Sequence, residues 1–162
     1  VTEDSAEIRR LLAEKGIRFE QWQTRELPDD ASAETILDAY QEEVAALKRE
    51  CGFQTADVVS LTPEHPEKTA FRQKFLNEHR HAEDEVRFFV KGQGLFCLHI
   101  DDKVYQVLCT RNDLISVPAN TPHWFDMGPA PRFVAIRLFN NPDGWVANFT
   151  GSDIAQRFNR LG

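Results

Sequence analysis

The second half of the chain decides the fold, and its pattern is set by the stretch Glu85-Val-Arg-Phe-Phe-Val-Lys-Gly-Gln-Gly-Leu-Phe-Cys-Leu-His-Ile-Asp-Asp102. Two apolar runs rich in aromatic residues are each followed by residues that favour turns, first Lys91–Gly94 and then Asp101-Asp102. Further turn signals follow at Arg111–Asp113, Pro118–Asn120 and Gly128-Pro129. Short strands with turn signals about every 8–12 residues are typical of an antiparallel sandwich or barrel.

The chain before His79 has the spacing of helices instead. The predicted elements are a helix that Asp4 caps and Gly16 ends, a helix from Ser32 to about Glu50, a short strand at Asp57–Leu61 and a helix at Glu67–Leu76. Helices followed by strands indicate an α+β protein that is mainly β. We expect one domain over residues 1–162, with a helical N-terminal part of about residues 1–78 packed on a β-barrel of about residues 79–162.

The composition excludes several classes of protein. The chain is 41% hydrophobic and 28% charged, which is ordinary for a globular protein and excludes a disordered one. A net charge of −7 repels phosphate backbones, so we expect no nucleic-acid partner. No apolar run has the roughly 20 residues of a membrane span. Three cysteines without a CxxC pair are typical of a reducing compartment, and we expect a cytoplasmic protein with Cys97 as a buried thiol.

Three of the five histidines form a pattern with one carboxylate. His79, His81 and Glu85 make an HxHxxxE motif, and His123 follows 38 residues after Glu85. Residues two apart on a strand share a face, so His79 and His81 are expected to point the same way, with Glu85 and Arg87 in the same parity. A single histidine is usually structural, and we interpret His65 and His99 so, the latter for lack of a nearby partner. The motif predicts a metal site.

Three imidazoles and a carboxylate suit Fe(II), Ni(II), Mn(II) or Zn(II). A four-ligand zinc site would be closed and structural, whereas an octahedral ion would keep two positions for a substrate. The surroundings favour the open site. Arg87 could hold an anionic substrate beside the metal, or it could form a salt bridge with Asp84 or Glu83. Phe75, Phe125 and Trp145 are candidate wall residues, and Arg137, among apolar neighbours, indicates a paired charge or a bound anion.

The sequences of these segments resemble those of known protein families. The HxHxxxE motif and the later Pro118 and His123 are similar to the two metal motifs of the cupin superfamily. The stretch Phe75-Leu-Asn-Glu-His-Arg-His-Ala-Glu-Asp-Glu-Val-Arg-Phe-Phe-Val90 resembles the acireductone dioxygenase family more specifically. So do the segments Lys15–Glu20, Gly94–Ile100, Leu114–Asp126 and Asn141–Trp145. The resemblance implies a cupin-type antiparallel β-barrel, or jelly roll, and a monomer.

The resemblance also implies an activity in methionine salvage. His79, His81, Glu85 and His123 would hold one Fe(II) or Ni(II) per monomer. The substrate would be the acireductone 1,2-dihydroxy-3-keto-5-methylthiopentene, which would chelate the metal as a dianion and react with O₂. The iron form would give 4-methylthio-2-oxobutanoate and formate. The nickel form would give 3-methylthiopropionate, formate and carbon monoxide.

The same resemblance assigns roles to residues around the ligands. Arg87 would form and hold the substrate dianion, and Glu78 and Asp84 would assist metal incorporation and relay local conformational change. Two alternatives remain open from the residues alone. One is another metal-dependent cupin enzyme, such as an isomerase or epimerase, which would need no O₂. The other is a non-catalytic cupin that binds a ligand.

Overall fold

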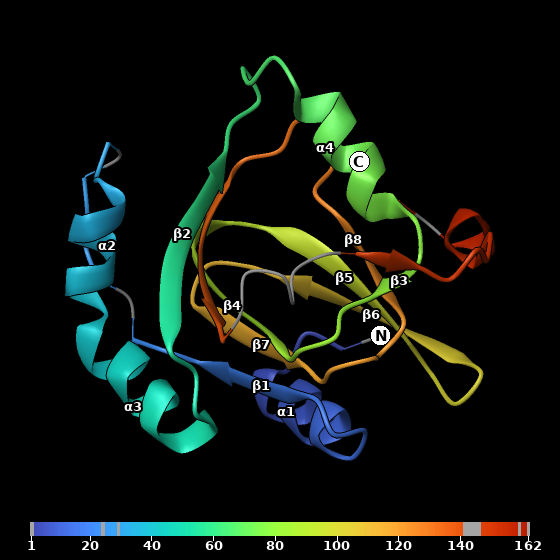
Figure 1. Ribbon diagram of the computed structural model, residues 1–162, viewed down its shortest axis with the longest axis horizontal. Coiled ribbons are helices and arrows are strands. Elements are labelled where there is room, and N and C mark those ends of the chain that lie inside the picture. Colours follow the sequence, from blue (N-terminus) through green and yellow to red (C-terminus); the bar gives the residue numbers. More distant parts are fainter. Residues whose placement is uncertain (1, 24, 29, 141–146, 159, 162) are drawn as a thin grey trace.

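The computed structural model describes residues 2–23, 25–28, 30–140, 147–158 and 160–161, which form two antiparallel five-stranded sheets with helices on the outside (Figure 1). The first sheet has the strand order β1-β7-β4-β9-β2. Its strands are β1 (Arg18–Gln21), β2 (Thr55–Leu61), β4 (Glu85–Gly92), β7 (Asp113–Val117) and β9 (Phe133–Phe139). The second sheet has the order β10-β3-β8-β5-β6. Its strands are β3 (His79–Arg80), β5 (Gly94–Ile100), β6 (Lys103–Cys109), β8 (His123–Asp126) and β10 (Asn148–Phe149).

The predicted turns make two kinds of connection, one within a sheet and one between the sheets. Asp101 and Asp102 both have positive φ, of 53° and 65°, and close a hairpin between β5 and β6 within the second sheet. The turn at Lys91–Gly94 instead carries the chain from β4 in the first sheet to β5 in the second. From β7 to β10, successive strands alternate between the two sheets. This crossing pattern is that of the expected cupin-type jelly roll, although in the described residues no strand pairing joins the two sheets into a closed barrel.

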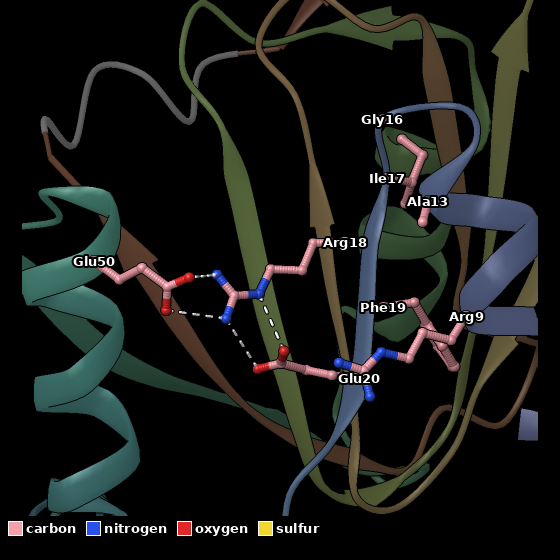
Figure 2. A pocket seen from close by; sticks show the side chains of 8 residues that line it. All are labelled: Arg9, Ala13, Gly16, Ile17, Arg18, Phe19, Glu20 and Glu50. Atoms are coloured by element: carbon pink, nitrogen blue, oxygen red, sulfur yellow. Dashed lines mark hydrogen bonds and ion pairs between the residues drawn. The ribbon is translucent and has the colours of Figure 1, made fainter. Parts of the chain in front are cut away.

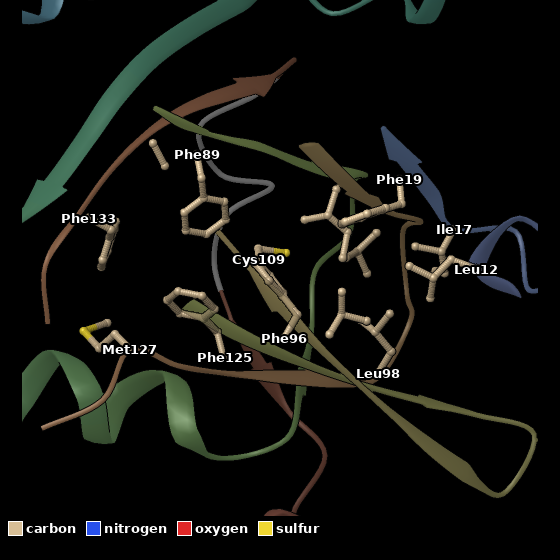
Figure 3. Close-up of a cluster of buried hydrophobic side chains, with 14 of the residues drawn as sticks. Leu12, Ile17, Phe19, Phe89, Phe96, Leu98, Cys109, Phe125, Met127 and Phe133 are labelled. Atoms are coloured by element: carbon tan, nitrogen blue, oxygen red, sulfur yellow. The ribbon is translucent and has the colours of Figure 1, made fainter. Parts of the chain in front are cut away.

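The main core lies between the sheets, where alternate residues of each strand point inward (Figure 3). Phe89 of β4, Phe96 of β5 and Phe125 of β8 meet there, and each is almost fully buried. Cys97 has the opposite parity to Phe96 and lies, fully buried, on the outer face of the second sheet. The prediction of a buried thiol at Cys97 is thus confirmed, and this burial raises the pKa of the thiol to about 11.

The helices cover the sheets from outside. They are α1 (Ser5–Ala13), α2 (Ala33–Ala39), α3 (Gln41–Cys51) and α4 (Lys68–Leu76), with a 3₁₀ helix η2 (Ile154–Arg157) near the C-terminus. The Asp4 carboxylate accepts from the backbone N–H groups of Ala6 and Glu7, which confirms the predicted cap. The side chains of α2 and α3 pack on the outer face of the first sheet, against Phe88 among others.

The prediction of one helix from Ser32 to about Glu50 is wrong at Tyr40. There the backbone leaves helical geometry, at φ −108° and ψ 19°, and separates α2 from α3. Tyr40 is fully buried, its ring lies 5.0 Å from that of Phe88, and its hydroxyl accepts a 3.0 Å hydrogen bond from the Arg25 backbone N–H. These tertiary contacts outweigh the helical preference of the segment.

The N-terminal part is also more than a helical layer. The predicted strand at Asp57–Leu61 is present as the longer β2, which pairs with β9. The strand β1 was not predicted, because Phe19 is its only apolar residue and four residues give little alternation. Both strands are edges of the first sheet, so residues before position 79 help to build the sandwich. Among the described helices, none combines the length and the apolar character needed to cross a membrane.

Candidate metal centre

Three imidazole rings meet between the sheets. His79 (β3), His81 and His123 (β8) each offer one ring nitrogen, and these atoms all lie within 4.8 Å of one another. All three residues are buried, with exposed fractions of 1%, 4% and 2%. His79 and His123 are direct partners in the β3–β8 pairing, which places their rings 4.6 Å apart. Arg80, between the two histidines of the motif, is exposed, as the predicted alternation of faces requires.

The orientation of two rings is fixed by the backbone. His79 Nδ1 lies 2.7 Å from the Asn77 carbonyl oxygen, and His123 Nδ1 lies 2.8 Å from that of Thr121. Because a carbonyl only accepts, each Nδ1 must donate its proton. Each Nε2 is then left to act as the donor atom toward the centre of the group. This arrangement is the usual way in which a protein orients imidazole ligands for a metal ion.

Glu85 reaches the same point from the opposite sheet. Its Oε2 lies 2.9 Å from His123 Nε2 and 3.4 Å from His81 Nε2. Glu85 has the parity of His79 and His81, but the three would share one face only if a single strand ran through residues 82–84, and it does not. The strand β3 ends at Arg80, and the chain crosses to the first sheet before β4 begins at Glu85. The carboxylate therefore faces the histidines across the core, because both sheets turn their inner faces to this site.

The electrostatics favour the metal-binding states of His79 and Glu85. Burial lowers the pKa of His79 to about 4, and the neighbouring His123 adds to this effect. His79 is therefore a neutral imidazole at neutral pH. Burial alone would raise the pKa of the Glu85 carboxyl, but Arg87 and then His123 hold that pKa well below its usual value. Burial would lower the pKa of His123, but the hydrogen bond and the charge of Glu85 raise it. A neutral His79 ring and a permanent carboxylate suit a divalent ion, which would displace the proton that Glu85 favours on His123.

Arg87 is the buried cation of the site. It is 7% exposed, and its Nε lies 3.0 Å from Glu85 Oε1. Its guanidinium carbon lies 5.2 Å from the ring centre of Phe125 and 5.9 Å from that of Phe96. The structure thus pairs Arg87 with Glu85, whereas the Asp84 carboxylate that the sequence offered as its partner is exposed and accepts a 2.8 Å hydrogen bond from the Ala119 N–H.

The predicted wall residues differ in position. The Phe75 ring, on α4, lies 6.3 Å from the His79 ring, and Phe125 lies in the core beside Arg87. Arg137 is the partner of Arg87 in the β4–β9 pairing, and its Nε donates to Asp57 Oδ1 over 2.8 Å. Of the two interpretations of Arg137, this ion pair with Asp57 confirms the paired charge. Trp145 lies outside the described residues.

A second set of polar side chains lies behind the histidines, on the outer face of the second sheet. The Glu78 carboxylate is 4% exposed, and its two oxygens lie 2.7 Å from His99 Nδ1 and 2.8 Å from Thr150 Oγ1. His99 is therefore a hydrogen-bonded residue, as interpreted, but the premise that it has no nearby partner is wrong. Glu78 and His99 are 21 residues apart in sequence, and the pairing of β8 with both β3 and β5 brings them together.

Two cavities lie apart from this centre. One, of about 510 Å³, is lined by residues of α1, β1 and α3, including Arg18, whose guanidinium binds both Glu20 and Glu50 (Figure 2). The other, of about 440 Å³, lies between α2 and the strands β2, β4 and β9. Neither is lined by the histidines or by Glu85. The chemistry of the donor groups, rather than the size of a hollow, therefore identifies the site.

The buried imidazoles fit a divalent metal ion in number, spacing and donor type. Together with the two facing antiparallel sheets, they define the class to which the chain belongs, that of cupin-fold proteins with a metal site between the sheets.

Within this class the family is shown by comparison with known proteins. The model of the ARD/ARD' family matches residues 2–147, and the chain belongs to this family. An acireductone dioxygenase of Alcanivorax borkumensis is 70% identical over 159 residues, which cover 98% of this chain and 88% of that protein. An acireductone dioxygenase of Hahella chejuensis is 68% identical over 160 residues, covering 99% and 86% of the two chains.

A solved structure agrees with the fold. An acireductone dioxygenase from Bacillus anthracis, with a cadmium ion in its active centre, superposes with a TM-score of 0.82. It is 31% identical in sequence, and the match covers 91% of each chain. The similarity in structure thus extends over nearly the whole chain.

Proposed function

We propose that this chain is a metal-dependent acireductone dioxygenase that uses Fe(II) or Ni(II), with one ion per chain, and acts as a monomer. The observation that carries the proposal is the convergence of three buried imidazoles within 4.8 Å, with a charged carboxylate against two of them. Membership of the ARD/ARD' family and relatives of that name at 70% and 68% identity support the choice of substrate. The substrate is 1,2-dihydroxy-3-keto-5-methylthiopentene, which is cleaved with O₂.

The ion would be held by His79, His81, His123 and Glu85. When bound, an iron or nickel ion supplies open coordination positions and the redox or Lewis-acid chemistry that the reaction of an enediol with O₂ requires. With iron the products are 4-methylthio-2-oxobutanoate and formate. With nickel they are 3-methylthiopropionate, formate and carbon monoxide.

The protein's own contribution begins with Arg87. A buried guanidinium next to the metal ligands attracts an anionic substrate and stabilises its deprotonated form, because a charge in a dry site is little screened. The neighbouring rings of Phe125 and Phe96 both lie against the guanidinium group and help to exclude water from it. Phe75 provides an apolar wall near His79. Arg137, held by Asp57, adds positive charge behind Arg87, and Trp145 is proposed as a further wall residue.

Glu78 and Asp84 support the ligands from outside the site. Glu78 precedes His79 and is fixed by His99 and Thr150, so it sets the position of the short strand β3. Asp84 binds the Ala119 N–H and thereby joins the loop before Glu85 to the loop before His123. We propose that both assist metal incorporation and relay movement between the ligand segments.

We propose a cytoplasmic location for the enzyme on the basis of its cysteines. Cys97 and Cys109 are free and fully buried, which is typical of a protein in the reducing cytoplasm.

The test combines elemental analysis with an oxygen pulse. Purified protein should hold one iron or nickel per chain, and the acireductone added without O₂ should bind but remain intact. Admitting O₂ should then cause its uptake and release formate. Protein reloaded with nickel should also release carbon monoxide, which the iron form should not. Conversion of the substrate without O₂, as in an isomerase, or metal-bound protein that leaves it intact in O₂, would refute the proposal.

A further inference from the structure

An aromatic side chain that the sequence analysis did not single out lies beside the metal centre. Phe149 is the second residue of β10, the strand at one edge of the second sheet, which appears in red next to β3 in Figure 1. Phe149 and His79 are direct partners in the β10–β3 pairing. Partners in an antiparallel pair carry their side chains on the same face, so Phe149 faces the same side of the sheet as His79.

The pairings extend this relation into a row across the second sheet. His79 pairs with His123, and His123 pairs with Leu98, which lies in the main core. Phe149 is therefore the edge member of an inward row that contains two of the proposed metal ligands. Its ring lies 5.9 Å from the His79 ring in an edge-to-face arrangement. The Phe75 ring also lies near the His79 ring, at 6.3 Å.

The exposure of Phe149 contrasts with that of the rest of the row. His79 is 1% exposed and His123 is 2% exposed, whereas Phe149 is 55% exposed. The Phe149 ring is half in water and lies against the buried imidazole of a proposed metal ligand, so a substrate bound at that ligand could contact it. A thioether suits this position, because sulfur makes favourable contacts with the edges and faces of aromatic rings.

We propose that Phe149 is a specificity-determining residue that binds the methylthio arm of the acireductone. This inference rests on the proposed function, which supplies a substrate whose enediol end is anionic and whose other end is an apolar thioether. The anionic end is drawn to Arg87 and the metal ligands in the interior. The thioether arm then extends past His79 toward the edge of the sheet, where Phe149 covers it.

The inference predicts a loss of selectivity rather than of catalysis. Removing the ring in Phe149→Ala removes contact with a part of the substrate that does not react, so KM rises and kcat is unchanged. Because the residue is half exposed, we expect an effect at the lower end of that of a buried apolar contact, about tenfold. An acireductone with a methyl group in place of the methylthiomethyl arm lacks the contact, and its kcat/KM should not change.

The experiment compares two substrates in four proteins that carry the same metal. The wild type, Phe149→Ala, Phe149→Leu and the control Phe158→Ala are assayed with the methylthio substrate and with the short analogue. Phe158 is also a partly exposed phenylalanine, 36% exposed, but its ring lies 5.9 Å from Trp124 on the outer face of the second sheet. Metal content and anaerobic binding of both substrates are measured as well, so the result does not depend on turnover alone.

The expected result is that Phe149→Ala lowers the preference for the methylthio substrate about tenfold, in both kcat/KM and anaerobic affinity. Phe149→Leu should lie between it and the wild type, and Phe158→Ala should match the wild type. An unchanged preference in Phe149→Ala, or an equal loss for both substrates together with loss of metal, would overturn the inference while leaving the dioxygenase intact. A wild type that turns over neither substrate would instead refute the proposed function, and with it this contact.

Discussion

Replacing Arg72 with methionine should destabilise the protein by breaking an ion pair that joins α4 to β8. Arg72 Nε lies 2.8 Å from Asp126 Oδ1, and its Nη2 lies 3.2 Å from Oδ2 and 2.9 Å from the Leu161 carbonyl oxygen. Asp126, only 1% exposed, also accepts from the backbone N–H groups of Gly128 and Leu161 at 2.9 and 2.8 Å. One carboxylate therefore ties together the helix before the metal-binding motif, the strand of His123 and the C-terminal residues.

The expected loss in the free energy of unfolding depends on the contacts that Asp126 keeps after the substitution. Removing one member of a buried ion pair costs about 3–5 kcal/mol, because the other charge stays buried without its partner. The Arg72 side chain is 19% exposed, and the two backbone donors to Asp126 remain, so we expect the lower end of that range, about 3 kcal/mol in the free energy of unfolding at pH 7. Methionine retains most of the apolar length of the side chain, which keeps lost packing small.

The stabilities of the wild type and of Arg72→Met depend differently on pH, because the substitution changes the pKa of Asp126. Burial would raise the pKa of Asp126, but Arg72, Gly128 and Leu161 lower it in the native protein. Its contribution to the stability of the native protein is thus complete above the unfolded pKa of about 3.9 and is lost as the pH falls through the lower folded value. Without Arg72 one of the contacts that lower this pKa is lost, so the folded pKa of Asp126 is higher in the variant than in the native protein. The stability difference between the two proteins is then full at pH 7 and shrinks as the pH falls through these folded values.

The assay is urea unfolding followed by far-ultraviolet circular dichroism at pH 7 and pH 4.5, with a chelator present so that metal release does not contribute. Asp126→Asn and the double variant complete a thermodynamic cycle, and we expect a coupling energy of at least about 2 kcal/mol between the two sites. A loss below about 1 kcal/mol for Arg72→Met at pH 7, or additive effects in the cycle, would contradict a buried and interdependent pair.

Three further changes test the site itself. His81→Ala should lower the affinity for iron or nickel by at least about 100-fold, since even an outer-shell partner is worth about 10–100-fold, and full occupancy by elemental analysis would remove His81 from the ligand set. Arg87→Ala should keep the metal and lower kcat/KM by about 10²–10³. Kinetics equal to those of the wild type would show that Arg87 has only a structural role, as the ion-pair partner of Glu85. Gly94→Ala would place a Cβ 2.3 Å from the Phe125 ring. We therefore expect the free energy of unfolding, measured by heat or urea, to fall by about 1–3 kcal/mol. An unchanged stability would show that the ring is free to move.

Local sequence determined a large part of this protein. The alternation of apolar residues and the turn residues from Glu85 onward predicted an antiparallel β structure, and the hairpin at Asp101-Asp102 follows from two residues that tolerate positive φ. The two-residue spacing of His79 and His81 predicted rings on one face, which the buried histidines and the exposed Arg80 between them confirm. Such features depend on neighbours within a few residues, and for that reason the sequence alone carries them.

Tertiary structure decided how the pieces meet. That Glu85 faces the histidines from the opposite sheet, that His99 binds Glu78, and that Phe149 lies beside His79 all depend on strand pairings between distant segments. The end of α2 at Tyr40 has the same kind of cause, since its buried hydroxyl and ring contacts come from other elements. A periodic pattern tells which face of a strand is buried, but the free energy that selects its partner comes from burial shared by both strands, and so it cannot be read from either one alone.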